Sequence, residues 1–139
     1  MKDSALDPIY LPLKVTFGLV PLLAGLDKFF NLLTDWKSYL SPALADMIPF
    51  QAATAMMIVG VIEAAVGLAI LTKLTRLGAF VAMVWLAAIS LNLVLLGAYD
   101  IAVRDLALAV GAYALGRVSE LKGLAWLPGR EDGRRAEYA

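Results

Sequence analysis

Cysteine and histidine are both absent from the 139 residues of this chain. Without cysteine the protein can form no disulfide, no thiol redox relay and no thiolate metal site. Without histidine it can hold no histidine-ligated haem, and it has no Ser-His-Asp or Cys-His catalytic arrangement. The titratable chemistry is left to carboxylates, lysine, arginine and tyrosine. We therefore predict no metal site and no intrinsic cofactor.

Net charge is lacking as well, because twelve basic and twelve acidic residues cancel. A neutral chain creates no overall field that would attract nucleic acid, so we expect no nucleic-acid partner. The chain begins MKDSALDPIYLP, with two aspartates and two prolines. A cleavable signal peptide would instead have a basic stretch followed by an apolar one, so none is expected here.

Apolar residues are in excess, at 61% of the chain. A soluble domain is about 45–50% apolar, so the surplus is expected to face lipid. Four apolar segments stand out: Tyr10–Leu33, Phe50–Thr72, Leu77–Ala98 and Ile101–Gly116. Their lengths are close to the roughly 20 residues that a helix needs to cross a bilayer. The sequence predicts an all-α fold, with a four-helix transmembrane domain in residues 1–121 and a polar cytoplasmic tail in residues 122–139.

The connection between the first two segments reads TDWKSYLSPALADMIPF, residues 34–50. Its aromatic and apolar residues recur at helical spacing. This pattern predicts a short amphipathic helix in the membrane interface, with Trp36 and Tyr39 as anchors at headgroup level. An ordered loop is the alternative.

Lysine and arginine are distributed unequally about the predicted spans. One side has Lys2, Lys14, Lys73, Arg76, Arg117 and Lys122, and the other has Lys28, Lys37 and Arg104. Basic residues concentrate on the cytoplasmic side of membrane proteins. The count predicts a multi-pass protein of the bacterial inner membrane, with both termini in the cytoplasm.

A glutamate, Glu63, lies in the middle of the second segment. A charge isolated in lipid costs about 2.5–3.5 kcal/mol, so it needs a partner or a function. Most other polar residues of the spans fall at mid-depth or in the outer half: Asp27, Lys28, Asn92, Arg104 and Asp105. We predict that these six residues meet in one internal polar cluster.

Within this cluster we expect Arg104 to pair with Glu63 or Asp27. Asp105 is then left to Lys28 or Asn92. Three interpretations of the cluster stay open. It is a structural network that fixes helix packing, a site for a quinone or lipid headgroup, or part of a proton or solute pathway.

Small residues recur within the spans. Gly18 and Gly25 in the first segment match Gly60 and Gly67 in the second, in the stretches GLVPLLAGLDKF and GVIEAAVGLAIL. Small residues let helices approach closely in lipid, where no hydrophobic force favours their association. The likeness also hints at an internal repeat.

The stretch GLVPLLAGLDKFFNLLTDW, the intramembrane Glu63, the short basic turn and the later YDIAVRDLALAVGAYAL together resemble the DoxX-like family of small four-helix membrane proteins. The resemblance covers about residues 10–120. Its most specific elements are residues 23–29, Glu63, and the pair Arg104 and Asp105. It implies a link to quinone-coupled respiratory reactions, such as those served by the small membrane subunits of thiosulfate:quinone oxidoreductase. Other relatives resemble partners of larger membrane complexes. A disulfide-redox role does not fit a chain without cysteine.

We therefore expect an accessory subunit of a larger membrane complex, respiratory or quinone-linked, with no catalytic activity of its own. The alternative is a quinone-binding component of an oxidoreductase, in which Glu63, Asp27 and Arg104 contact the headgroup and handle its proton. A small-solute or proton transporter, acting as a homo-oligomer, is the third possibility.

Overall fold

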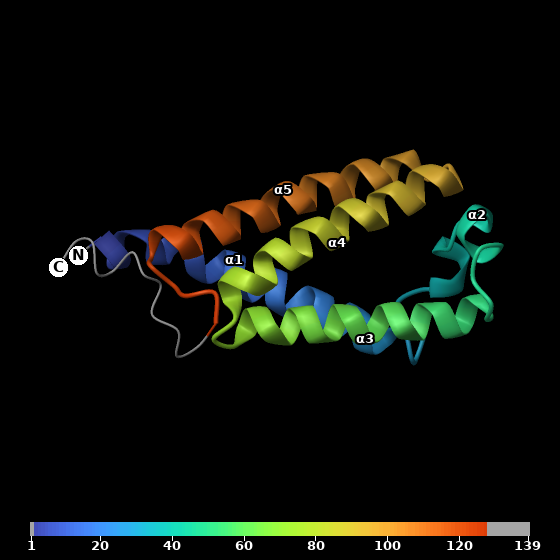
Figure 1. Ribbon diagram of the computed structural model, residues 1–139, viewed down its shortest axis with the longest axis horizontal. Helices are drawn as coiled ribbons and strands as arrows, with labels where there is room; N and C mark the ends of the chain where they lie inside the picture. Colours follow the sequence, from blue (N-terminus) through green and yellow to red (C-terminus); the bar gives the residue numbers. More distant parts are fainter. Residues whose placement is uncertain (1, 128–139) are drawn as a thin grey trace.

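The computed structural model describes residues 2–127, and within this range the chain is helical and contains no strand (Figure 1). The α-helices are α1 (Lys2–Asp27), α2 (Pro42–Ala45), α3 (Ala52–Leu71), α4 (Thr75–Leu96) and α5 (Tyr99–Leu121), and a 3₁₀-helix, η1, spans Trp36–Tyr39. Helices α1, α3, α4 and α5 are long, lie side by side, and each runs antiparallel to the next in the chain. The predicted all-α class is confirmed. Of the predicted tail, residues 128–139 lie outside the described part of the chain.

Three of the described helices are long and apolar enough to cross a membrane. They are Ala5–Asp27 within α1, Ala52–Leu71 in α3 and Thr75–Leu96 in α4. Their composition indicates a membrane protein. Helix α5, where the fourth span was predicted, has a similar length of 23 residues but carries more charge, including Asp100 and Arg104 near its start.

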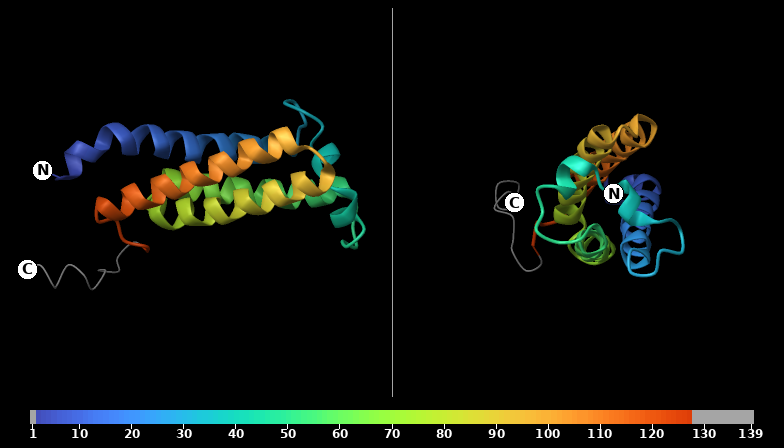
Figure 2. Two further views of the ribbon diagram at one scale, coloured as in Figure 1. Left: turned by 90° about the horizontal axis from the view of Figure 1, so that it is seen from above. Right: turned by 90° about the vertical axis from the view of Figure 1, so that its right-hand side faces the viewer.

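Helix α1 packs most closely on α3, and α4 on α5, as the end-on view in Figure 2 shows. The α1–α3 contact is made backbone to backbone at paired glycines. A Cβ atom at Gly25 would lie 2.5 Å from the carbonyl oxygen of Gly60, and one at Gly67 equally close to that of Gly18. Only glycine permits this approach. The two similar stretches seen in the sequence therefore pack against each other in antiparallel fashion, so that the first glycine of each contacts the second glycine of the other.

The main apolar core lies between the two helix pairs. It consists of Tyr10, Phe17, Ile70, Ala79, Ala82, Ala112 and Leu115. The ring of Phe17 covers Gly111, and that of Phe80 covers Gly116. Aromatic rings on one helix thus fill the space that glycine leaves on another.

The two ends of the helix assembly differ. We call residues 28–51, which link α1 to α3, the connector, and the end at which they lie the connector end. Helix α1 begins, and α5 finishes, at the opposite end, here called the terminal end (Figure 1). The turn between α3 and α4 also lies at the terminal end. The connector end holds most of the polar residues singled out from the sequence.

Two predicted boundaries are wrong in the connector region. The first helix was expected to reach Leu33, but α1 ends at Asp27 and the chain then turns at Asn31, which has a φ of 53°. The single amphipathic helix is replaced by η1 and α2, each four residues long. Pro42 explains the break: the residue before a proline is disfavoured in the helical region, and Ser41 is extended, with ψ 144°.

Candidate functional site: the polar network at the connector end

Asp27 ends α1 and organises the turn that follows it. One carboxylate oxygen accepts the backbone N–H of Leu32 at 3.1 Å, and the other accepts that of Leu33 at 2.9 Å. The second oxygen also accepts the indole N–H of Trp36 at 2.9 Å. All three donors come from the connector. The hydrogen bonds of Asp27 are therefore made with residues that directly follow it in the chain. The predicted pair of Asp27 with Arg104 is not formed.

Lys28 and Glu63 form the central ion pair of the site. Lys28 Nζ lies 2.5 Å from Glu63 Oε2, and the two residues are only 5% and 9% exposed. To reach Glu63, the lysine side chain crosses α3 at Gly60, where an added Cβ would lie 3.0 Å from the Cβ of Lys28. A buried charge is tolerated when an opposite charge neutralises it at hydrogen-bond distance. The predicted need of Glu63 for a partner is thus met, by Lys28 in place of Arg104.

Trp36 covers this ion pair. The Lys28 ammonium lies 3.8 Å from the centroid of the Trp36 ring, in cation–π geometry. Tyr39 lies beside Trp36, with ring centroids 6.2 Å apart. The indole of Trp36 thus contacts Lys28 through the face of its ring and donates its N–H to Asp27. Trp36 was predicted to anchor the connector in the headgroups, whereas in the structure it is directed into the protein.

Asn92 holds the second half of the connector against α4. Its side-chain amide donates to the carbonyl of Tyr39 at 2.7 Å, and its side-chain oxygen accepts the backbone N–H of Ser41 at 3.0 Å. Ser41 is completely buried. One amide side chain therefore satisfies a donor and an acceptor of an irregular, buried segment. Its predicted role as a partner of Asp105 is replaced by this contact.

Arg104 and Asp105, at the start of α5, lie apart from the Lys28–Glu63 pair. The Arg104 side chain is 67% exposed, and its Nε lies 3.5 Å from the carboxylate of its neighbour Asp105. Asp105 itself is buried and lies near enough to Lys28 for an electrostatic interaction. Of the six residues predicted to form one cluster, Asp27, Glu63 and Asp105 thus lie around Lys28, whereas Asn92 contacts the connector and Arg104 faces outward.

A second polar network, at the terminal end, was not predicted from the sequence. Arg76 is 5% exposed; it donates to the carbonyl of Leu124 at 3.1 Å, and its guanidinium lies 4.1 Å from the ring of Trp126. Glu120 lies 3.7 Å from Arg76 and 2.6 Å from Arg117.

In the same network Lys122 forms an ion pair with Asp7 of α1. The Tyr10 hydroxyl lies 3.4 Å from that of Thr75, which in turn donates to the carbonyl of Ile70. The sequence offered one signal for this network: Arg76 is basic and lies at the start of an apolar helix. We interpreted Arg76 only as a marker of orientation.

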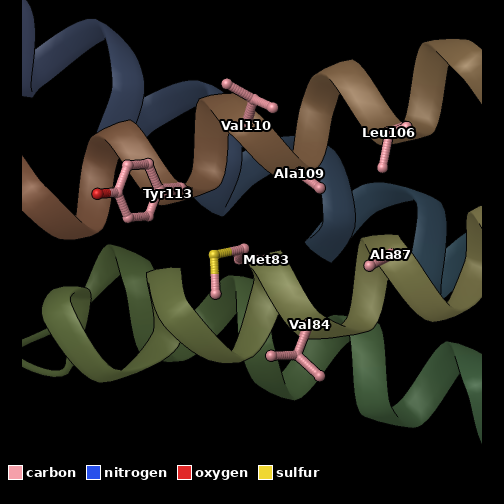
Figure 3. A pocket seen from close by; sticks show the side chains of 7 residues that line it. All are labelled: Met83, Val84, Ala87, Leu106, Ala109, Val110 and Tyr113. Carbon is pink, nitrogen blue, oxygen red and sulfur yellow. The ribbon is translucent and has the colours of Figure 1, made fainter.

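A shallow apolar groove of about 430 Å³ runs between α4 and α5 on the outside of the molecule (Figure 3). It is lined by Met83, Val84 and Ala87 of α4 and by Leu106, Ala109, Val110 and Tyr113 of α5. It holds no charged residue and none of the polar-network residues. The groove is thus separate from the ion pair and offers contacts only to an apolar surface.

Chemically, the charged groups of the connector-end network are each ion-paired or hydrogen-bonded within the protein. Among the described residues no group of three or more carboxylate, histidine or cysteine side chains could hold a metal ion. Glu63 is paired with an ammonium and Asp27 accepts three hydrogen bonds, so their charges are compensated within the protein. This arrangement fits a network that fixes how the helices and connector pack.

Comparison with known proteins adds no relative. No protein-family model, curated protein or solved structure matches this chain.

Proposed function

We propose that this chain is a small four-helix integral membrane protein of the DoxX-like family and serves as an accessory subunit of a larger membrane complex. The proposal rests on one observation. Large apolar side chains point outward on every long helix, while the buried charges of Lys28 and Glu63 neutralise each other. Val20 of α1, Val61 of α3, Val84 of α4 and Val110 of α5 are all 57–64% exposed.

The accessory role is supported by the lack of a free carboxylate among the described residues of the polar network at the connector end. Glu63 and Asp27 are already bonded within the chain, so neither is free to act on a substrate without rearrangement. The described parts outside the long helices are also short. A protein of this kind contributes packing surface and a sealed polar interior to a complex whose redox groups lie in other subunits. A respiratory or quinone-linked complex is the partner that the family resemblance implies.

We place the protein in a bacterial inner membrane, with helix α5 as the fourth span and both termini in the cytoplasm. The charged residues of α5 are compatible with its being a membrane span. Arg104 lies only about one and a half turns from the start of the helix, so its long side chain can extend to the headgroups. The terminal end, with Lys73, Arg76 and Arg117, is then the cytoplasmic side.

Orientation can be tested directly because the chain has no cysteine. Lys37 of the connector and Lys73 of the α3–α4 turn are both exposed lysines and form a matched pair. In intact spheroplasts, a membrane-impermeant maleimide should label Lys37→Cys at once and Lys73→Cys only after permeabilisation. The reverse pattern would invert the proposed topology, and equal labelling of both would contradict a spanning arrangement.

The accessory role is tested by gentle solubilisation of native membranes and purification through a tag on this chain. A larger membrane complex should copurify in fixed ratio and should lose assembly or stability when the chain is deleted. Recovery of the chain alone, from membranes in which its gene is expressed at natural level, would count against the proposal.

A second candidate function is a quinone- or lipid-headgroup site at the same network. One observation favours it: Asp105 is buried near Lys28, yet its carboxylate is paired with the exposed Arg104. A polar headgroup between Lys28 and Asp105 would find both a donor and an acceptor. The purified protein should then retain quinone, and Glu63→Gln should lose it. Quinone content equal to that of an unrelated membrane protein would exclude quinone as the ligand of this candidate site.

A further inference from the structure

The turn directly after α1 presents an unusual amount of apolar surface. Phe29 is 45% exposed, Phe30 70%, Leu32 84% and Leu33 70%. Turns usually carry polar residues, because their side chains meet water. In Figure 2 this turn, drawn in light blue, projects sideways beyond α1 and away from α4 and α5. We call residues 29–33 the apolar turn.

The backbone N–H groups of the apolar turn are all hydrogen-bonded within the chain. Every N–H from Lys28 to Leu33 has an acceptor within the chain. The first four bond to backbone carbonyls: Lys28 to Ala24, Phe29 to Leu26, and both Phe30 and Asn31 to Asp27. The last two bond to the Asp27 carboxylate. An N–H group without an acceptor would cost several kcal/mol in hydrocarbon, so these bonds lower the cost of placing the turn in lipid.

The apolar turn also continues the outward face of α1. Val20, Leu23 and Leu26 are 58%, 53% and 47% exposed. Asp27 and Lys28, the two charged residues between this face and the turn, are directed inward and almost fully buried. The chain presents exposed charge again only at Asp35 and Lys37. From Leu19 to Leu33 the outward surface thus carries no charged side chain, and Asn31 is the one exposed polar residue on it.

From these observations we infer that the apolar turn inserts as a wedge among the acyl chains of the membrane's outer leaflet, the one that faces away from the cytoplasm. This inference rests on the proposed placement of α1 in a bilayer. The connector residues that contact lipid are then Phe30, Leu32 and Leu33, whereas Trp36 closes the interior. The membrane boundary lies beyond the helix end, near Asp35 and Lys37. The Lys28–Glu63 pair is therefore at hydrocarbon depth although Lys28 follows the last residue of α1.

The test is a depth measurement by nitroxide labels in liposomes of neutral phospholipid, at a low ratio of protein to lipid. Single-cysteine variants Leu32→Cys, Lys37→Cys and Val20→Cys, all at exposed positions, are labelled. Their collision rates with oxygen, which enriches in hydrocarbon, and with a water-soluble nickel chelate are compared. Near-native helicity and a monodisperse elution profile establish that each variant is folded.

We expect the label at residue 32 to match that at residue 20, with high oxygen and low nickel collision rates, and the label at residue 37 to show the opposite. A label at residue 32 that collides with nickel, while that at residue 20 does not, overturns the wedge but leaves α1 in the membrane. Low collision with both reagents at residue 32 means that protein covers the turn, and this also overturns the inference. Nickel collision at residue 20 refutes the membrane placement itself.

Discussion

The side chain of Lys28 passes over Gly60 to reach Glu63. Because Gly60 has no side chain, it allows both the close approach of the α1 backbone and the passage of the lysine side chain. A Cβ at Gly60 would lie 2.5 Å from the carbonyl oxygen of Gly25 and 3.0 Å from the Cβ of Lys28. Helix packing and charge pairing are therefore coupled at one position. Any change there acts on both.

This coupling predicts that Gly60→Ala is strongly destabilising. The new methyl group meets backbone, which cannot move without separating α1 from α3, and overpacking of this kind costs about 1–3 kcal/mol or more. Gly111→Ala is the control, because its Cβ would meet side-chain atoms only, those of the Phe17 ring, at 2.6 Å, whereas the Cβ at Gly60 meets backbone. Thermal unfolding in mild detergent should show the larger loss for Gly60→Ala. Equal losses would mean that the glycine contact is not a close backbone packing.

The ion pair should behave as a unit. Lys28→Met leaves a buried carboxylate without its partner, and breaking such a pair costs about 3–5 kcal/mol. The double change Lys28→Met with Glu63→Leu removes both charges and should restore most of this loss, since an apolar pair of similar volume is often neutral. The stability of the single and the double variant against a denaturing detergent, each compared with the native chain, checks this.

Arg104→Met is the control for the ion-pair prediction. The Arg104 side chain is 67% exposed, so its pair with Asp105 should contribute less than about 1 kcal/mol. If Arg104→Met destabilises the protein as much as Lys28→Met does, Arg104 is a main partner in the cluster, as the sequence predicted, and our assignment of the pair is wrong.

The sequence could predict the helices because each is a long apolar run, and α3 and α4 lie within two residues of the expected limits. It could not predict the end of α1. Phe29–Leu33 is as apolar as the helix before it, so composition does not separate the two. What ends the helix is the Asp27 carboxylate, whose oxygens bond to the backbone N–H groups of Leu32 and Leu33. That contact is visible only in three dimensions.

The residue pairs of the polar network at the connector end could likewise not be predicted from the sequence. The sequence brought the correct residues to one end, because depth follows from position along a helix. Pairing depends instead on the rotation of each helix about its axis. That rotation turns Arg104 outward and directs Lys28 across α3. Arginine is the usual partner of a buried carboxylate, but here lysine supplies the opposite charge.

Replacement of Asn92 by Leu, which has a similar volume but cannot hydrogen-bond, should increase local opening of the connector. Two hydrogen bonds to the connector are lost, each contributing about 0.5–1.5 kcal/mol. Hydrogen exchange at the amide of Ser41 should accelerate by about tenfold or more, while amides in the middle of α3 keep their rates. Ser38→Ala, at an exposed connector position, should leave the Ser41 rate unchanged. Uniform acceleration throughout the protein would instead indicate a global effect.

Trp36 makes two separable contacts, and substitutions can divide them. Trp36→Phe keeps an aromatic face over Lys28 but loses the hydrogen bond to Asp27, whose carboxylate still has two backbone donors, so a loss of about 1 kcal/mol is expected. Trp36→Leu also removes the cation–π contact and should cost about 0.5–2 kcal/mol more. Both are measured by unfolding in detergent, first in the native background and then with Lys28→Met. Without the ammonium the difference between Phe and Leu should nearly vanish. If it persists at full size, Trp36 stabilises the connector by packing alone and does not act on the charge beneath it.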